Sequence, residues 1–342
     1  MIREAIQRLL ERRDLSRDEA RDVMDEVMRG EATAAQIAGY LVALRSKGET
    51  VAEIAGSAEA MRRHALPVHP ARADVIDTAG TGGDGAGTLN LSTAAALVAA
   101  SAGAAVAKHG NRAVSSACGS ADVLEALGFD IELDPQAIAR SIDELGFGFL
   151  YAPLHHPAMR HAGPVRRELA TRTVFNVLGP LTNPAGARGQ VVGVFAEELA
   201  GVVAEALAIL GTHRAFVVHG AGGIDELSPA GPNLVYEVRD GDIHRTVVEP
   251  GELGLAPSHP AALRGGTPAE NAAAIREVLG GAAGPARDAV LLNAAYALVV
   301  AGRVEDPRDG LELAANAIDT GAAAERLDAL VAFSRAERAE AS

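Results

Sequence analysis

The first 66 residues carry apolar side chains at helical spacing, broken by recurring start and stop signals. A hydroxyl residue precedes Glu or Gln by three positions at three places: Ser16 and Glu19, Thr33 and Gln36, and Thr50 and Glu53. In this capping box the two residues satisfy each other's free backbone amides, so each pair predicts the beginning of a helix. Gly30 and Gly48 stand where the preceding helices should end. The proline-rich stretch at residues 64–70 then predicts a linker.

After residue 73 the pattern changes to short β-branched or apolar runs separated by longer runs rich in Ala and Leu. The short runs predict strands at residues 74–77, 104–107, 190–195 and 215–219. The longer runs predict helices at residues 92–101, 121–127, 135–145 and 197–210. This alternation is typical of an α/β domain with a mostly parallel sheet. Residues 234–239 and 244–248, joined across Asp240-Gly241, predict a hairpin, and the chain from residue 268 onward is again mostly helical.

Composition narrows the class of protein. The chain has 342 residues, of which 48% are hydrophobic and 22% charged, a balance typical of a folded globular protein. Its net charge of −14 disfavours nucleic acid and anionic membranes as partners, because both would be repelled over most of the surface. Cys118 is the single cysteine, which excludes an intrachain disulfide and a cysteine-rich zinc site. The longest uncharged stretch, residues 88–107, is too weakly apolar for a membrane span, and we expect a cytoplasmic protein.

The segment Asp77-Thr-Ala-Gly-Thr-Gly-Gly-Asp-Gly85 follows a predicted strand directly. Its glycines permit positive φ angles and leave backbone amides able to converge on an anion. Gly80, Gly82 and Gly85 also match the spacing of a dinucleotide fingerprint. That fingerprint requires a helix to begin on the glycines and an acidic residue about twenty positions later. Here the helix begins only near Ser92 and the next strand ends in Lys108, so an anion-binding loop is favoured, with a plain structural turn as the alternative.

A second segment, Lys108-His-Gly-Asn-Arg112, ends the next predicted strand. The only other lysine is Lys47, so a lysine at a strand end, where α/β proteins place ligands, suggests a point charge for a diphosphate. The hydroxyls and glycine of residues 115–120 follow and suit phosphate oxygens. An ordinary surface lysine is the alternative.

Adjacent carboxylates stand at Asp225-Glu226, after a glycine-rich stretch that follows a predicted strand. Two neighbouring carboxylates repel each other unless a cation lies between them. Their hard oxygen ligands point to Mg²⁺, which typically combines one or two carboxylates with substrate phosphates. A solvated surface pair is the alternative.

Two further groups of residues carry weaker signals. Arg166-Arg167-Glu168 alone predicts no more than a charged helical turn. His155, His156 and His161 lack a further ligand at zinc-binding spacing, so we interpret them as loop histidines with satisfied hydrogen bonds.

Together these strings resemble the anthranilate phosphoribosyltransferase family, nearly end to end and in the same order. The matching strings are GTGGD at residues 80–84, TLNLSTA at 88–94, KHGNR at 108–112, SSACGSAD at 115–122, PVRREL at 164–169, RTVFNVLGPLTNP at 172–184 and GGIDE at 222–226. The resemblance implies the fold of the pyrimidine nucleoside phosphorylases, with a small helical domain and a larger α/β domain. Residues 1–66 and about 164–181 would form the first, and residues 73–163 and 182–342 the second. The resemblance also implies a homodimer with its active site between the domains.

The resemblance also implies the site residues. Contacts to phosphoribosyl diphosphate are expected from Gly80, Gly82, Gly83, Asp84, Thr88, Asn90, Leu91, Ser92, Thr93, Lys108, His109, Gly110, Asn111, Arg112, Ala113, Val114, Ser115, Ser116 and Ser120. Two Mg²⁺ ions are expected, one bound by Ser92 and the other by Asp225 and Glu226. Anthranilate would contact Gly80, His109, Asn111 and Arg166, the last of these facing its carboxylate. Lys108, His109 and Arg166 would carry the catalysis.

The implied reaction transfers the phosphoribosyl group of phosphoribosyl diphosphate to the amine of anthranilate, a step of tryptophan biosynthesis. The base that accepts the proton is left open between His109 and the substrate's own carboxylate. We expect Lys108→Ala or Asp225→Ala to lower turnover sharply without unfolding the protein. A pyrimidine nucleoside phosphorylase and a non-catalytic homologue that binds nucleic acid are the alternatives.

Overall fold

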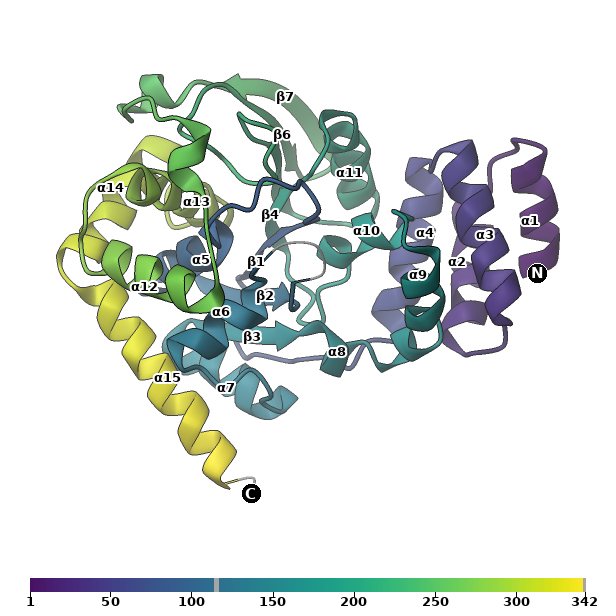
Figure 1. Ribbon diagram of the computed structural model, residues 1–342, viewed down its shortest axis with the longest axis horizontal. Helices are drawn as coiled ribbons and strands as arrows, with labels where there is room; N and C mark the ends of the chain where they lie inside the picture. Colours follow the sequence, from purple (N-terminus) through teal and green to yellow (C-terminus); the bar gives the residue numbers. More distant parts are fainter. Residues whose placement is uncertain (114–116, 341–342) are drawn as a thin grey trace.

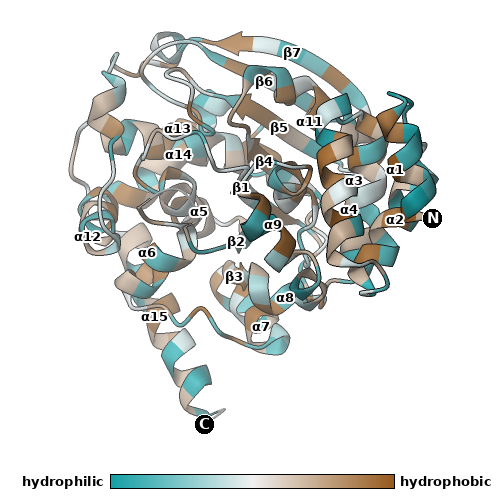
Figure 2. Cartoon of the chain, turned by 45° about the vertical axis from the view of Figure 1, so that its right-hand side comes forward, coloured by the Kyte–Doolittle hydropathy of each residue, from teal (hydrophilic) through white to brown (hydrophobic). Residues whose placement is uncertain are grey.

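The computed structural model describes residues 1–113 and 117–340. Its N-terminal part is a bundle of α1 (Ile2–Leu10), α2 (Arg17–Met28), α3 (Ala34–Lys47) and α4 (Val51–Arg63), which lies at one end of the molecule (Figure 1). All three predicted capping boxes are confirmed, and Gly30 and Gly48 follow their helices with positive φ angles of 73° and 95°. Figure 2 shows hydrophobic and hydrophilic residues mixed along these helices, as expected when one face of each is buried.

One sheet organises the rest of the described chain. Its seven strands lie in the order β3-β2-β1-β4-β5-β6-β7. The strands are β1 (Val75–Gly80), β2 (Ala105–Gly110), β3 (Phe147–Tyr151), β4 (Gly189–Gly193), β5 (Arg214–His219), β6 (Asn233–Arg239) and β7 (Asp242–Val248). The first five in this order are mutually parallel, and β6 and β7 join them as an antiparallel hairpin. The predicted α/β class with a mostly parallel sheet is confirmed, as is the hairpin turn at Asp240-Gly241, where both φ angles are positive.

Helices cover both faces of the sheet. The α-helices are α5 (Leu91–Ser101), α6 (Ser120–Leu127), α7 (Pro135–Leu145), α8 (Ala152–His155), α9 (Gly163–Leu169), α10 (Phe175–Leu178), α11 (Glu197–Ile209), α12 (Pro268–Leu279), α13 (Pro285–Val300), α14 (Pro307–Asp319) and α15 (Ala322–Glu340), and the 3-10 turns are η1 (Pro157–Arg160), η2 (Gly179–Leu181), η3 (Pro250–Leu253) and η4 (Pro260–Leu263). The buried helices α5 and α13 pack together on one face, and α11 packs on the other face and against α4. Alternate residues of β4 divide between the two cores: Val191 faces the α5 and α13 side, and Val192 the α11 side. No helix in residues 1–113 and 117–340 is long and apolar enough to cross a membrane.

The predicted strands need correction at several places. β2 runs to Gly110, beyond its predicted end at residue 107, and β4 ends at Gly193, before its predicted end at residue 195. β1 runs three residues past Asp77, to Gly80, because Asp77, Thr78 and Ala79 are buried and pair with β4. β3 was not predicted at all. Its five residues are a short run around Gly148, where a Cβ would collide with α7 side chains, and such a run gives no reliable period.

The segment at residues 164–181 returns to the N-terminal bundle. α9 packs against α3 and α10 against α4, and Figure 1 shows both helices between the bundle and the sheet. Val165, Phe175 and Leu178 belong to the same apolar core as the bundle. This packing supports the proposed assignment of the segment to the helical part, whose boundaries remain a prediction.

Candidate functional site

The predicted site residues converge at the carboxyl ends of the parallel strands. β1 ends in Gly80, β2 carries Lys108, and the loop with Asp225 and Glu226 follows β5. The strand order reverses at β1. The chain first leads from β1 to β2 and β3 on one side, and it later returns to form β4, which pairs with β1 on the other side. Ligands of open α/β sheets bind at such a switch in strand order, outside the carboxyl ends.

The glycines at this edge allow the acidic loop to approach the sheet closely. Gly80 and Gly193 are paired across β1 and β4, and a Cβ on Gly80 would overlap the carboxylate of Asp225. A Cβ on Gly193 would overlap the backbone carbonyl of Asp225. The backbone N–H of Gly82 donates to Asp225 Oδ2 at 2.7 Å. These positions therefore serve the placement of Asp225, which a plain structural turn would not require.

The same loop presents unused backbone donors. Gly82, Gly83 and Gly85 have positive φ angles of 63°, 76° and 73°. Among the described residues, no protein acceptor bonds to the backbone N–H groups of Gly83, Asp84 and Gly85. Successive backbone N–H groups in such a turn form a concave site for an anion. The loop is therefore suited to bind phosphate oxygens.

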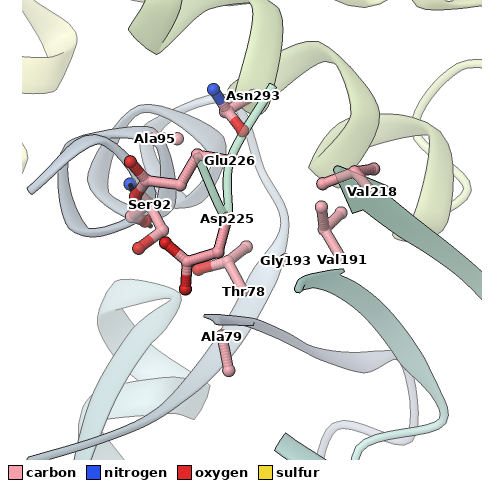
Figure 3. A pocket seen from close by; sticks show the side chains of 10 residues that line it. All are labelled: Thr78, Ala79, Ser92, Ala95, Val191, Gly193, Val218, Asp225, Glu226 and Asn293. Carbon is pink, nitrogen blue, oxygen red and sulfur yellow. Dashed lines mark hydrogen bonds between the residues drawn. The ribbon is translucent and has the colours of Figure 1, made fainter. Parts of the chain in front are cut away.

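The carboxylates of Asp225 and Glu226 lie beside Ser92 at the start of α5 (Figure 3). The backbone N–H of Ser92 donates to Glu226 Oε1 at 2.7 Å. Burial, with the nearby Asp84 carboxylate, raises the pKa of Asp225 to about 6. Burial, with the charge of Asp225, raises the pKa of Glu226 to about 8. The pair is not a solvated surface pair, because its charged form is unfavourable at this site unless a cation lies beside it.

Lys108 lies beneath these carboxylates and not on the surface. Its side chain is 2% exposed, and Nζ donates to the backbone carbonyl of Thr78 and, at 3.3 Å, to Ser92 Oγ. Burial lowers the pKa of Lys108, while the charges of Asp77 and Glu226 act in the opposite direction. The alternative of an ordinary surface lysine is wrong. Because Lys108 is the buried counter-charge of several carboxylates, the expectation that its loss leaves the fold unaffected is also revised.

The donor set fits a magnesium ion that shares its coordination with a substrate. Ser92, Asp225 and Glu226 supply a hydroxyl and two carboxylates at one point. In the described ranges, no three His, Cys, Asp or Glu side chains are grouped so as to bind a metal by themselves. Mg²⁺ commonly takes one or two carboxylates and completes its octahedron with water and phosphate oxygens. The residues present therefore fit the expected metal.

A buried asparagine from α13 holds the acidic loop in place. Asn293 Oδ1 accepts from the backbone N–H of Leu227 at 3.0 Å, and its Nδ2 donates to the carbonyl of Leu227 at 2.8 Å. Leu227 directly follows Glu226, so this pair of bonds fixes the position of the carboxylates. Sequence analysis missed Asn293, because it lies 66 residues from Leu227 and belongs to no recognisable string.

The residues around the start of α5 surround this centre. Leu91 is fully buried, and Thr93 Oγ1 is buried without a hydrogen-bond partner among the described residues. Asn90 is the N-cap residue, and its side chain donates to the carbonyl of Cys118 at 3.2 Å. Thr88 forms an isolated bridge with Arg264. Leu91 can thus contribute only through its backbone.

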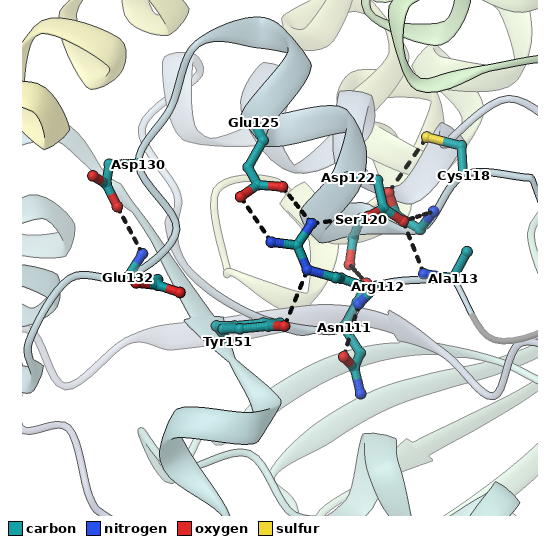
Figure 4. Close-up of polar contacts among 11 residues, drawn as sticks. Asn111, Arg112, Ala113, Cys118, Ser120, Asp122, Glu125, Asp130, Glu132 and Tyr151 are labelled. Atoms are coloured by element: carbon teal, nitrogen blue, oxygen red, sulfur yellow. Dashed lines mark hydrogen bonds and ion pairs between the residues drawn. The ribbon is translucent and has the colours of Figure 1, made fainter. Parts of the chain in front are cut away.

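Arg112 is held in a polar network after β2 (Figure 4). Its guanidinium donates to Glu125, to Asp122 at 3.1 Å and to the Tyr151 hydroxyl at 3.2 Å. The backbone N–H of Arg112 is also engaged, since it donates to Asn111 Oδ1 at 2.8 Å. Three of the expected contacts, Val114, Ser115 and Ser116, lie outside the described residues.

Asp122 and Ser120 bond to the backbone at the two ends of the segment that follows β2. Asp122 Oδ2 accepts from the backbone N–H groups of Ala113 and Gly119, both at 2.8 Å. Ser120 Oγ donates to the backbone carbonyl of Asn111 at 3.3 Å, and a Cβ on Gly110 would overlap that hydroxyl. The two ends of the segment are thus brought together.

His109 lies on the side that faces α10. Its Nδ1 bonds at 3.2 Å to the backbone carbonyl of Gly179, which can only accept, so Nδ1 carries the proton. Nε2 then has a lone pair and no hydrogen-bond partner among the described residues. Burial and the neighbouring ring of His156, 5.0 Å away, lower the pKa of His109 to about 3. The ring is therefore neutral at ordinary pH.

The interpretation of His155 and His156 as satisfied loop histidines holds only in part, since Nδ1 of His155 bonds to the backbone carbonyl of Leu66 at 3.0 Å. Both are buried, and the Nε2 atom of each lacks a partner in the described part of the chain. Both histidines are placed by β3, which leads directly into α8 and which the sequence pattern did not predict. A recognised strand at residues 147–151 would have placed both histidines at the same sheet edge as His109.

Arg166 on α9 offers a cation with no ion-paired carboxylate among the described residues. Its guanidinium lies 5.1 Å from the ring centre of Phe175 on α10. Burial lowers its pKa, and no acidic group opposes that shift. A half-buried guanidinium without a protein anion is suited to bind an anionic ligand.

Asp77 connects β1, β2 and the chain that returns from α10. It is fully buried and accepts from the backbone N–H of His109 at 3.1 Å and from Asn183 Nδ2 at 2.7 Å. Burial, opposed by the charge of Lys108, raises the pKa of Asp77 to about 6. Asp77 thus fixes the backbone that carries His109.

The raised pKa of Asp77 predicts a pH-dependent stability. Because the folded state holds this proton more tightly than the unfolded chain, the resulting stabilisation is complete below about pH 4 and lost as pH rises through 6. Relative to Asp77→Asn, the wild type should lose about 1 kcal/mol of unfolding free energy between pH 5 and 7. Urea unfolding of both proteins at pH 5, 6 and 7 measures this difference. A difference that stays constant over this range would show that the pKa of Asp77 is not raised.

Two models of one family match nearly the whole chain. The helical bundle domain of the glycosyl transferase family matches residues 3–65, and the a/b domain of the same family matches residues 72–324. Among curated relatives, the anthranilate phosphoribosyltransferase of Roseiflexus sp. (strain RS-1) is 56% identical over 336 residues, covering 98% of each chain. That of Symbiobacterium thermophilum is 51% identical over 337 residues, covering 98% of this chain and 99% of the relative.

Solved structures agree with the sequence relatives. The crystal structure of anthranilate phosphoribosyltransferase from Thermus thermophilus superposes with a TM-score of 0.92 at 49% identity, covering 97% of this chain and 99% of that one. The enzyme from Saccharomyces cerevisiae in complex with PRPP and Mg superposes with a TM-score of 0.90 at 29% identity, covering 98% of both chains. Similarity therefore extends over the helical bundle, the sheet and the whole site described above.

Proposed function

The chain belongs to the anthranilate phosphoribosyltransferase family, and we propose that the edge of the sheet around Asp225 is its catalytic centre. At this edge the protein transfers the phosphoribosyl group of phosphoribosyl diphosphate to the amine of anthranilate and releases diphosphate. One observation carries the assignment of the site. The carboxylates of Asp225 and Glu226, whose charged forms are unfavourable here without a cation, lie against a glycine loop whose unpartnered amides suit an anion. A magnesium diphosphate satisfies both.

Two magnesium ions are proposed, one bound through Ser92 Oγ and one through Asp225 and Glu226. The relative solved with PRPP and Mg supports the identity of the metal. When bound, Mg²⁺ neutralises negative charge that develops on the departing diphosphate. The N–H groups of Gly83, Asp84 and Gly85 would donate to the same oxygens, and buried Lys108 would keep Ser92 and the carboxylates in position.

Arg166 and His109 would act on anthranilate, the acceptor of the phosphoribosyl group. Arg166 pairs with no carboxylate in the described part of the chain and would bind the carboxylate of anthranilate, whose aromatic amine is already neutral and needs no activation. Attack on the sugar carbon forms an ammonium product, which is a strong acid because its nitrogen is attached to an aromatic ring. A weak base is enough to remove that proton. His109 Nε2, neutral and without a partner among described residues, is therefore favoured over the substrate's carboxylate, which Arg166 would occupy.

The decrease of anthranilate fluorescence tests the proposed function. With purified protein, the fluorescence should fall only when Mg²⁺ and phosphoribosyl diphosphate are both present. Leaving out either one, or adding EDTA, should abolish the decrease. A steady signal with all components present would refute the function, whereas a decrease without Mg²⁺ would refute the metal assignment alone.

Arg166→Ala should raise KM for anthranilate by about 10- to 100-fold, because a hydrogen bond to a charged group contributes about 1.5–3 kcal/mol. KM for phosphoribosyl diphosphate should change little. Steady-state kinetics with each substrate varied in turn measures both values. Arg167→Ala, one position along α9 and exposed, is the matched control and should leave both KM values unchanged. An unchanged anthranilate KM in Arg166→Ala would place the carboxylate elsewhere.

We also propose a cytoplasmic homodimer that acts in tryptophan biosynthesis. Met1, Leu10 and Val42 are exposed by 59%, 65% and 47%. Met1 directly precedes α1, Leu10 ends it, and Val42 lies on α3, which packs against α1. A second copy of the chain would cover this apolar surface. Light scattering should give the mass of two chains for the wild type and of one for Leu10→Asp combined with Val42→Asp. A monomeric wild type would refute the dimer.

A further inference from the structure

Arg172 lies in the segment between α9 and α10, outside every group of residues to which a role has been assigned above. Its side chain is exposed, and no carboxylate among the described residues forms an ion pair with it. The segment extends from the helix that carries Arg166 toward the glycine loop at the end of β1. Arg172 therefore stands between the proposed sites of the two substrates.

Two contacts hold the Arg172 guanidinium in place. One Nη donates to the backbone carbonyl of Gly83, in the middle of the glycine loop. The guanidinium carbon lies 4.0 Å from the ring centre of Phe195, which is close enough for a stacked cation–π contact. The backbone N–H of Phe195 in turn donates to Thr81 Oγ1 at 3.1 Å. Phe195 and Arg172 thus bind the loop at two neighbouring points, Thr81 and Gly83.

The bond to Gly83 determines the direction of a donor. In a planar trans peptide the C=O and N–H bonds point in opposite directions. When Arg172 holds the carbonyl of Gly83, the N–H of Asp84 in the same peptide must face away from the guanidinium. That N–H is one of the donors with no protein acceptor among the described residues. The orientation of this peptide depends on ψ of Gly83 and φ of Asp84, and Gly83 restricts its own ψ little because it has no Cβ.

We propose that Arg172 is a positioning residue for phosphoribosyl diphosphate, acting through the Gly83–Asp84 peptide. The inference rests on the proposed function and adds a residue to it. Arg172 stacks on Phe195, holds the Gly83 carbonyl and so keeps the loop amides directed at the diphosphate. Because Arg172 belongs to the chain that joins α9 to α10, it also fastens the acceptor side of the site to the diphosphate side.

Steady-state kinetics of Arg172→Ala, Arg172→Lys and Phe195→Leu tests the proposal. Arg172→Ala should raise KM for phosphoribosyl diphosphate about 10-fold, while KM for anthranilate changes less than about twofold. Arg172→Lys should recover only part of this loss, because an ammonium keeps the charge but lacks the planar stack. Phe195→Leu should raise the same KM. In the Arg172→Ala/Phe195→Leu double variant, this KM should rise by less than the product of the two single increases. Exposed Arg167→Ala is the matched control and should leave both KM values unchanged.

Several outcomes would overturn the proposal. Full activity in Arg172→Lys together with unaffected Phe195→Leu would mean that only charge matters. Equal increases in both KM values, or a melting temperature lowered by more than about 4 °C in Arg172→Ala, would mean a general structural role. An active wild type with an unchanged diphosphate KM in Arg172→Ala overturns this inference alone. An inactive wild type overturns the proposed function and the inference with it.

Discussion

Asp225→Asn is expected to lower kcat/KM by about 10²–10³-fold, comparable to the loss of one strong electrostatic stabiliser in other enzymes. The same substitution should raise the free energy of unfolding of the protein without ligand. Burial and the charges of Asp84 and Glu226 make an ionised carboxylate unfavourable at this position, and an amide removes that charge. Its oxygen can still accept from the backbone N–H of Gly82. Activity and stability should therefore change in opposite directions.

Kinetics over a range of Mg²⁺ concentrations and urea unfolding at pH 7.5 measure the two effects. The activity lost in Asp225→Asn should be partly recovered at high Mg²⁺ concentration, because a weaker site needs more metal. Glu198→Gln, an exposed carboxylate on α11, is the matched control and should change neither quantity. Wild-type kinetics in Asp225→Asn would show that the cation site has been assigned to the wrong residues.

Lys108→Met is expected to abolish most turnover, by about 10²-fold or more, and to destabilise the protein by about 3–5 kcal/mol. Methionine fills a similar volume but leaves the buried charges of Asp77 and Glu226 without their cation. It also removes the donor to Thr78 and Ser92. Removing one partner of a buried charge pair destabilises a protein strongly because the remaining charge is uncompensated.

The second lysine of the chain provides the control. Lys47 is also largely buried and pairs with Glu53 at 3.0 Å, but it lies in the N-terminal bundle. Lys47→Met should lower stability and leave kcat unchanged. Adding Asp77→Asn to Lys108→Met should restore part of the stability and none of the activity. Turnover that recovers together with stability would mean that Lys108 has no role in the reaction beyond folding.

The local elements of this fold could be predicted from the sequence because their signals are local. A capping box needs only residues three positions apart, and all three begin a helix as expected. The alternation of strands and helices gave the α/β class and most strand positions. The order of the strings resembling the family, with Asp225 and Glu226 on a glycine-rich stretch, predicted candidate residues for the site before their arrangement was known.

The tertiary structure decided how these residues meet and what their surroundings do to them. The short run at β3 could not be assigned from its period. The position of His155 and His156 at this edge of the sheet could therefore not be predicted. Burial turned Lys108 from the expected point charge for a diphosphate into a counter-charge beneath the carboxylates. Asn293 and Arg172 act on residues 66 and 89 positions away in the chain, through bonds that no sequence window contains.

The sequence by itself therefore determined the elements, the fold class and the candidate chemistry of this protein, because each depends on residue types within a few positions. The pairing of β1 with β4 determined the rest. It placed Gly80 and Gly193 side by side, let Asp225 approach where a Cβ would collide, and set the acidic loop against the glycine loop. The carboxylates, the buried lysine and the free amides lie together because strands distant in the sequence share this edge of the sheet. Only the folded chain brings those strands side by side.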